Sequence, residues 1–204
     1  GPENTEGYVD PTNYFEYDRD IAIAECLTRV VCAFLAYYTD DVSGQRIFVL
    51  QKRAATKQEF PSALTYTSSG HGEIGDMELT DSGKTVIGFG KGIRREAGEE
   101  VGFEKVSDDS SKDSPDGIDY GPFMIREPTT TKLVFLNVQE IHAKDVDKLH
   151  ADPSEVESIF PISQGQLEAE LLVEKGLSKA TGKLKYTPTF VSVMSQLLPM
   201  LNGG

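Results

Sequence analysis

Three glutamates lie close together in residues 95–103, which read Arg-Glu-Ala-Gly-Glu-Glu-Val-Gly-Phe. Glu96, Glu99 and Glu100 have the spacing i, i+3, i+4, which places all three carboxylates on one face of a helix. Carboxylates this close repel one another unless a positive charge lies among them. A hard divalent cation, which prefers oxygen ligands, supplies that charge. The spacing therefore predicts a metal site on a helix over about residues 93–101, with Gly102 as its end.

The other residues of this segment predict how the helix is held. Ile93, Ala97 and Val101 form an apolar ridge on a different face, which we expect to pack against a sheet. Arg95 precedes Glu99 by four residues, so we expect an ion pair between them. An acidic helix face that is merely solvated is the alternative interpretation of the three carboxylates.

Residues 95–103 match the second half of the Nudix signature at all seven of its specified positions. That pattern is Arg-Glu, an apolar residue, any residue, Glu-Glu, any residue, Gly and an apolar residue. Residues 70–76 resemble its first half, with Gly70 at the opening and Asp76 where the family has a glutamate. The family then leaves seven residues before the arginine of the second half, whereas this chain has 18. The sequence therefore predicts an insertion at about 77–92.

The resemblance implies an α/β fold, the Nudix-type α/β/α sandwich with a central mixed β-sheet. Similar enzymes hydrolyse nucleoside diphosphates linked to another moiety, using Mg²⁺ or Mn²⁺. On that pattern Glu99 and Glu100 are metal ligands, and Glu96 is a further ligand or the base that prepares water. The backbone carbonyl of Ser69 is the expected ligand from the loop, and Arg95 is counted with the catalytic residues. The family resemblance thus predicts a metal-dependent pyrophosphohydrolase.

Other parts of the chain are expected to complete the site. Lys52 and Arg53, at the end of a predicted strand, are candidates to bind substrate phosphate together with Gly70. For Lys52, a solvated strand end is an equal alternative. A further acidic ligand or base often comes from a later loop in this family. The candidates, which the sequence does not separate, are Glu140, Glu155 and Glu157.

A narrower resemblance concerns the isopentenyl-diphosphate isomerase branch of the superfamily, which residues 50–61, 65–71 and 186–190 resemble. Those isomerases use a cysteine just before the histidine-containing loop to move a proton. Here residues 67–69 read Thr-Ser-Ser, and serine is a far poorer proton donor or base near neutral pH. The chain also has no tryptophan to flank their second catalytic glutamate. Hydrolysis is therefore the preferred prediction, with an isomerase-like enzyme or a non-catalytic nucleotide sensor as alternatives.

Periodicity and turn residues predict the elements that position this site. Strands are expected at 27–38, 46–53, 132–138 and 156–162, and further helices at 166–174 and 189–201. A turn at 40–44 joins the first two strands into a hairpin. Residues 68–76 read as a glycine-rich loop, the chain up to Gly92 as irregular, and 107–117 as a polar loop. We expect a single domain over 21–204, with an N-terminal arm at 1–20 and a helix at its end.

Charge and composition narrow the partners. A net charge of −13 over 204 residues argues against a nucleic-acid polymer, which requires a basic face, but not against a small diphosphate screened by cations. No apolar stretch reaches membrane-spanning length, and no charged-then-apolar leader opens the sequence. Cys26 and Cys32 would lie roughly 20 Å apart in an extended segment, so buried free thiols are expected. These features favour a cytoplasmic protein; its oligomeric state is open, with a homodimer as one option.

Overall fold

The computed structural model describes residues 28–73, 76, 90–103, 117–127, 130–177 and 185–203, without the side chains of 174–177. The predicted arm at 1–20, Cys26, most of the predicted insertion and nearly all of the loop at 107–117 lie outside these residues. In chain order the elements are β1 (Thr28–Thr39), β2 (Arg46–Arg53), β3 (Leu64–Thr65), β4 (Ser68–His71), α2 (Gly90–Val101), β5 (Ile118–Arg126), β6 (Thr131–Glu140), a 3₁₀ helix (Ala143–Lys148), β7 (Val156–Ser163), α3 (Gln164–Leu177) and α4 (Pro188–Gly203).

Strand β1 lies at the centre of a mixed sheet of seven strands among the described residues. It pairs in parallel with β6 along most of its length, and β6 pairs antiparallel with β5. On its other edge β1 pairs antiparallel with β2, across the predicted turn at 40–44. Strand β7 pairs antiparallel with the far edge of β2. The predicted hairpin and the predicted mixed sheet are both confirmed.

Strands β1 and β2 separate after a short paired region, and this fork positions the site. They pair only through residues 36–39 and 46–49; beyond these, β4 pairs with β1 and β3 pairs with β2. Thr67 lies between the two branches, where its hydroxyl accepts the Ala36 N–H at 2.8 Å and donates to the Val49 carbonyl. Residues Ser68–His71 therefore form a strand, not the beginning of the glycine-rich loop that the sequence predicts for 68–76.

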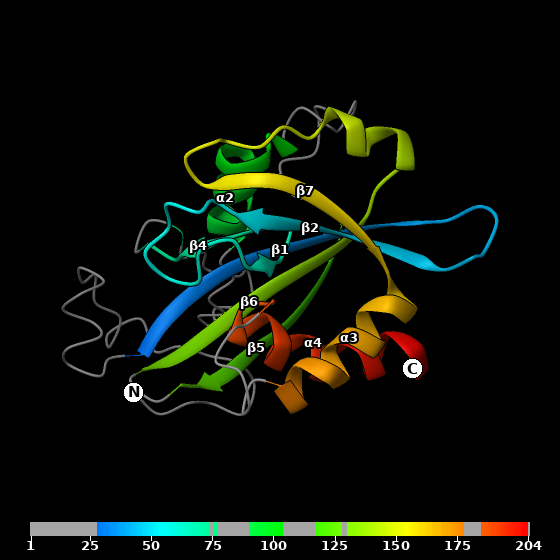
Figure 1. Cartoon of the computed structure of the whole chain (residues 1–204). Helices are drawn as coiled ribbons and strands as arrows, with labels where there is room; N and C mark the ends of the chain where they lie inside the picture. Colours follow the sequence, from blue (N-terminus) through cyan, green and yellow to red (C-terminus); the bar gives the residue numbers. More distant parts are fainter. Residues whose placement is uncertain are drawn as a thin grey trace, which may run out of the picture.

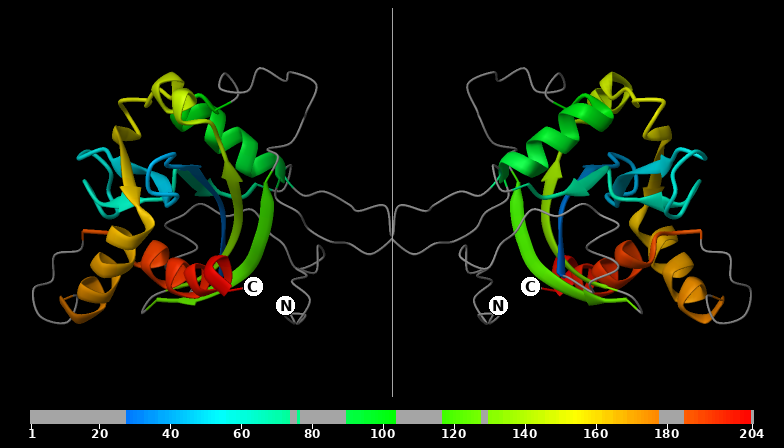
Figure 2. Two further views of the ribbon diagram at one scale, coloured as in Figure 1. Left: turned by 90° about the vertical axis from the view of Figure 1, so that its right-hand side faces the viewer. Right: turned by 90° about the vertical axis from the view of Figure 1, so that its left-hand side faces the viewer.

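Helices cover both faces of the sheet, as Figures 1 and 2 show, with α2 on one face and α3 and α4 on the other. Side chains of β1 alternate between the two cores: Cys32 and Phe34 pack on the α2 side, Ala33 and Leu35 on the α3–α4 side. Burial on both faces explains the continuous apolar run of this strand. Cys32 is a buried free thiol, as predicted. The α/β/α sandwich predicted from the family resemblance is confirmed.

Other boundaries differ from the sequence predictions. Helix α2 begins at Gly90, so the residues just before Gly92 are helical rather than irregular. Strand β5 is not predicted at all, because a Gly-Pro pair within it normally indicates a turn. The strand accommodates that pair where its register with β6 shifts between Tyr120 and Phe123. Within the described part of the chain, no helix combines the length and apolarity that crossing a membrane requires.

Candidate active site

Helix α2 is fixed against the sheet by the apolar ridge that the sequence predicts. Ile93, Ala97 and Val101 are at most 3% exposed and belong to the core on this face of the sheet. The helix ends at Gly102, which has a φ of +65° and donates its N–H to the Gly98 carbonyl at 3.1 Å. A left-handed glycine here is the usual way to end a helix. The face that carries the glutamates is thereby turned away from the core, toward β4.

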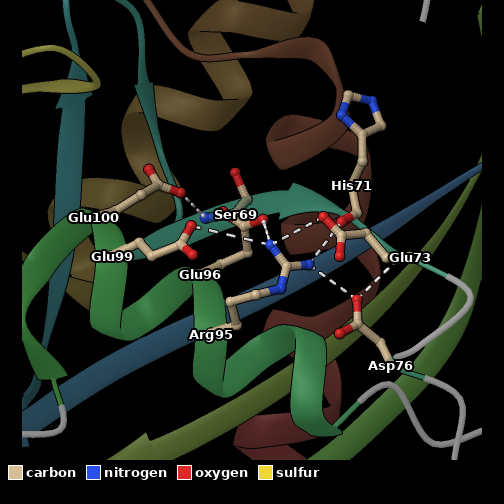
Figure 3. A network of polar contacts seen from close by, with 8 residues as sticks. All are labelled: Ser69, His71, Glu73, Asp76, Arg95, Glu96, Glu99 and Glu100. Atoms are coloured by element: carbon tan, nitrogen blue, oxygen red, sulfur yellow. Dashed lines mark hydrogen bonds and ion pairs between the residues drawn. The ribbon is translucent and has the colours of Figure 1, made fainter. Parts of the chain in front are cut away.

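Arg95, midway along this helix, contacts four acidic side chains (Figure 3). Its guanidinium lies 2.9 Å from Asp76 and 2.8 Å from Glu96, and more loosely 3.7 Å from Glu73 and 4.0 Å from Glu99. The predicted ion pair with Glu99 is thus present but is the longest of the four. A further hydrogen bond of 3.3 Å to the His71 carbonyl attaches the arginine to β4. Arg95 therefore connects the helix to the strand and to Asp76.

Glu100 is the most deeply buried of the three glutamates, at 5% exposure. Its two carboxylate oxygens accept the backbone N–H of Ser69 at 3.0 Å and the side-chain amide of Gln51 at 2.9 Å. Burial raises the pKa of Glu100 to about 7, although both hydrogen bonds act in the opposite direction. The buried carboxylate is thus costly to ionise until a positive charge arrives.

Glu96 and Glu99 differ from Glu100 in exposure. The Glu96 carboxylate lies beside Gly70, so close that a Cβ added to Gly70 would be 2.1 Å from the Glu96 carboxyl carbon. Burial raises the pKa of Glu96, and Arg95 partly opposes that rise. The side chain of Glu99 is 63% exposed, so no packing fixes its rotamer. On this side of the helix, burial therefore increases from Glu99 through Glu96 to Glu100.

A cavity of about 820 Å³ opens beside these glutamates. The acidic side chains of its wall come from α2, from residues 152–155, and from Glu59 after β2 and Glu73 after β4. Cationic and hydroxyl side chains come from β1, β6, the segment after β2 and the beginning of α4. A cavity that carries both acidic and basic side chains suits a ligand that combines phosphates with a metal ion.

Solved structures share this arrangement of sheet and helices. A NUDIX hydrolase from Alicyclobacillus acidocaldarius is 12% identical over 84% of this chain and 91% of its own, with a TM-score of 0.54. The NUDIX domain of NrtR from Shewanella oneidensis, complexed with ADP ribose, is 9% identical over 91% and 94%, with a TM-score of 0.51. The MutT protein from Methanosarcina mazei Go1 is 13% identical over 87% and 96%, with a TM-score of 0.50. The chain has the Nudix fold. No protein-family model and no curated protein matches the sequence.

Within the Nudix fold, the structure supports the alignment proposed for the first half of the signature. Asp76 stands at the glutamate position of that half, and it forms the 2.9 Å ion pair with Arg95 of the second half. It also accepts the Glu73 N–H at 2.8 Å, which closes a short turn before it. An aspartate reaches Arg95 here because Gly92 lets the helix approach: a Cβ on Gly92 would lie 2.8 Å from the Asp76 carboxylate. The two halves of the signature therefore meet in space despite the long separation in sequence.

The candidate substrate residues fall in different places. Arg53 and Gly70 line the cavity. The Arg53 guanidinium donates to the Glu59 carbonyl at 3.0 and 3.2 Å. Lys52 lies outside the cavity wall and pairs with Glu157 at 3.2 Å, with more than a third of each side chain exposed. The structure thus brings Arg53 to the site but not Lys52.

Of the three later carboxylates, Glu155 is the one that lines the cavity. Glu157 pairs with Lys52, and Glu140 accepts the hydroxyl of Thr39 at 2.8 Å. Backbone bonds hold the loop before Glu155 against the end of α2: His150 N–H donates to the Val101 carbonyl at 3.2 Å, and Asp152 N–H to the Glu100 carbonyl at 2.9 Å. The end of α2 therefore positions the loop that carries Glu155.

Sequence reasoning missed several residues of the cavity. Lys57 lines it and forms an ion pair with Glu155, and Asp152 lines it from the loop after the 3₁₀ helix. Gln51, on β2, holds Glu100 without touching the cavity wall. Lys57 lies only four residues from Arg53, so a positive cluster after the strand was the available signal. Nothing in the local sequence around Gln51 indicates its partner, which lies 49 residues away.

The donors around Glu100 fit a divalent cation in type and charge. Glu96, Glu99 and Glu100 offer the hard oxygen ligands that Mg²⁺ and Mn²⁺ prefer. Ser69, on β4, lines the same cavity. Burial raises the pKa of both Glu96 and Glu100, and a cation bound beside them would favour their ionised forms. Among the described residues, no three acidic, histidine or cysteine side chains already enclose a metal position. The exposed Glu99 is the ligand candidate free to move inward.

Proposed function

We propose that this chain is a metal-dependent pyrophosphohydrolase that cleaves a diphosphate bond, in a nucleoside diphosphate linked to another moiety. The observation that carries the proposal is the set of carboxylates that line one cavity: Glu96, Glu99 and Glu100 from α2, and Glu155 from the loop before β7. The pKa of both Glu96 and Glu100 is raised by burial, with Glu155 contributing in each case. Such a cluster is unfavourable for the fold alone and suits the binding of a cation.

The roles follow from depth and contacts. Glu99 and Glu100 are the proposed ligands of Mg²⁺ or Mn²⁺, together with the carbonyl of Ser69. When bound, the metal polarises the phosphoryl oxygen and lowers the pKa of the attacking water. Ser69 N–H and Gln51 orient Glu100 from the protein side, which keeps its oxygens in place whatever its protonation state. The small substrate is held in the same cavity.

Glu96 is the proposed base. Burial raises its pKa, which makes the carboxylate a stronger base, and Arg95 with Gly70 fixes the position of that carboxylate. The oxygen of water bonds to phosphorus while the bridging phosphorus–oxygen bond breaks and its electron pair leaves with the departing phosphate. The proton of water passes to Glu96. Arg53 and Lys57 supply positive charge on the wall toward which the phosphates lie.

The structural neighbours support this choice of chemistry. One is a NUDIX hydrolase, and another is a NUDIX domain complexed with ADP ribose, which contains a diphosphate between two sugars. Retention of all three glutamates of the signature favours hydrolysis over a purely sensing role. Neither the isomerase nor the sensor has a particular contact in its favour.

The test is phosphate release from a panel of nucleoside diphosphate derivatives and isoprenyl diphosphates, with Mg²⁺ or Mn²⁺ and with EDTA. We expect metal-dependent hydrolysis of a nucleoside diphosphate derivative, lost in Glu100→Gln while substrate binding persists. Conversion of isopentenyl to dimethylallyl diphosphate would instead establish the isomerase. Metal-independent binding without turnover would establish the sensor.

A further inference from the structure

A second group of side chains lines the cavity away from α2. We call Arg29, Lys132, Thr187 and Thr189 the basic wall. Arg29 and Lys132 are register partners on the parallel strands β1 and β6, so their side chains project from the same face of the sheet as neighbours. They are only 5% and 7% exposed. Two adjacent buried cations require compensating negative charge.

Among the described residues, carboxylates neutralise Lys132 more closely than Arg29. Lys132 pairs with Glu127 at 3.2 Å. In the part of the chain that the structure describes, Arg29 forms an ion pair with Glu59 at 3.5 Å, longer than a good charge-assisted hydrogen bond, and a third of the Glu59 side chain is exposed. Arg29 also contacts the ring of His71, but its buried Nε has no hydrogen-bond partner. Arg29 therefore retains donor capacity at the cavity wall.

The beginning of α4 adds to the same wall. Thr187 and Thr189 flank Pro188, the first residue of this 16-residue helix, and both line the cavity. Val191 N–H donates to the Thr187 carbonyl, so the N–H groups of Thr189 and Phe190 lie before the first intrahelical bond. The first turn contains no acidic residue, and one carboxylate, Glu127, faces both the helix end, where it accepts the Thr189 hydroxyl at 3.2 Å, and Lys132. Helix and side chains thus present positive charge to one place.

We propose that the basic wall binds a phosphate group that the substrate carries in addition to the diphosphate that is cleaved. Two buried cations and a helix N-terminus together suit a dianion better than a carboxylate. Glu59 can turn into solvent when that anion arrives, because it is partly exposed and its ion pair with Arg29 is long. The assignment rests on the proposed function and narrows its substrates to nucleoside diphosphate derivatives that carry a further phosphate.

The first experiment measures binding of inorganic phosphate by calorimetry in EDTA. Without metal the carboxylates of α2 repel phosphate, and the measurement does not depend on hydrolysis. Because Arg53 and Lys57 line the same cavity, the difference between variants, not the signal itself, reports the basic wall. The test variant is the double substitution Glu127→Gln/Lys132→Met, which removes both members of one ion pair so that neither is left without its partner. The control is Glu170→Gln/Lys185→Met, which removes the ion pair between Lys185 and Glu170, two residues that do not line the cavity.

We expect the wild type and the control to bind phosphate equally, and the test variant at least about tenfold more weakly. Circular dichroism verifies that each variant folds; if the test variant does not, Thr189→Val serves in its place. Absence of phosphate binding by the wild type, or equal binding by the test and control variants, would overturn the proposal.

The second experiment compares kcat/KM with Mg²⁺ for matched substrates: NADPH with NADH, and coenzyme A with dephospho-coenzyme A. UDP-glucuronate with UDP-glucose tests a carboxylate in place of phosphate. We expect about a tenfold preference for the phosphorylated member of a pair, absent in the test variant and retained in the control. Hydrolysis without such a preference, or a preference for UDP-glucuronate alone, contradicts the proposal. If no substrate is cleaved, the proposed function fails and the calorimetry alone decides about the basic wall.

Discussion

Arg95 of α2 donates a hydrogen bond of 2.9 Å to Asp76, which precedes it by 19 residues. The pair joins the two halves of the Nudix signature. The Asp76 side chain is 8% exposed and that of Arg95 is 27% exposed, so water screens their attraction only in part. Arg95 in turn holds Glu96, the proposed base, at 2.8 Å. The ion pair between Asp76 and Arg95 does not line the cavity, but through Arg95 it contacts the proposed base.

Asp76→Asn is expected to lower the free energy of unfolding by about 2 kcal/mol, because Arg95 loses its most buried carboxylate partner. We also expect kcat to fall, since Glu96 is then less firmly placed. Urea unfolding and steady-state kinetics measure the two effects. Glu73→Gln is the matched control, because Glu73 lies 3.7 Å from the same arginine and is 57% exposed. An equal loss of stability in both variants would show that the short ion pair has no special role.

The free energy of unfolding should depend on pH because of Glu100. Its pKa is about 7 in the folded chain against 4.5 for an unperturbed glutamate, so the folded state binds its proton more tightly than the unfolded state does. This contribution is therefore fully present below pH 4.5 and is lost as the pH rises through 7. The difference corresponds to about 3 kcal/mol. Glu96, whose pKa is also raised, acts in the same direction.

Melting temperatures in EDTA between pH 4.5 and 8 measure this effect. We expect the wild type to lose stability across that interval and Glu100→Gln to lose less of it. Addition of Mg²⁺ should reverse the trend, because a cation favours the ionised carboxylate and its binding then releases a proton. Parallel pH profiles of the two proteins in EDTA would argue against a raised pKa at Glu100.

Gly70→Ala should disturb the site while leaving the fold intact. A Cβ at this position would lie 2.1–2.4 Å from the carboxyl atoms of Glu96, the flexible end of a side chain that can move away. We expect kcat to fall by about tenfold or more and the melting temperature to change little. Gly165→Ala is the control, since the only atom near its Cβ is Gln45 Oε1, at an ordinary 3.5 Å. Unchanged kinetics in Gly70→Ala would mean that the position of Glu96 does not matter for turnover.

The sequence predicts those features of this protein that depend on local order. The spacing of Glu96, Glu99 and Glu100 identifies their helix, because helical periodicity shows which face is buried. Unbroken apolar runs identify β1 and β6, because both faces of these strands are buried. Strand β5 escapes prediction because its pairing with β6 outweighs the local preference of a Gly-Pro pair for a turn. Periodicity also cannot show that β1 and β2 separate into a fork.

The local sequence also cannot show which distant residues meet at the site. The sequence leaves Glu140, Glu155 and Glu157 as equal candidates, since their order in the chain does not say which turns toward α2. Two long-range backbone bonds, from His150 and Asp152 to the end of α2, decide the position of that loop. The basic wall is likewise invisible in sequence, because Arg29 and Lys132 become neighbours only when β1 and β6 pair.

Glu155 and Glu157 therefore provide a sharp comparison. The Glu155 side chain lines the cavity, raises the pKa of Glu96 and Glu100, and pairs with Lys57. Glu157 forms an ion pair with Lys52, near the end of β2, and neither residue lines the cavity. We expect Glu155→Gln to lower kcat by about 10- to 100-fold and to raise the Mg²⁺ concentration needed for half-maximal activity, because a carboxylate beside the proposed metal site is lost. Glu157→Gln should remain within about twofold of the wild type, as surface ion pairs contribute little. Metal titrations of initial rates distinguish the two, and a larger defect in Glu157→Gln would mean that the loop before β7 presents a different carboxylate to the reaction.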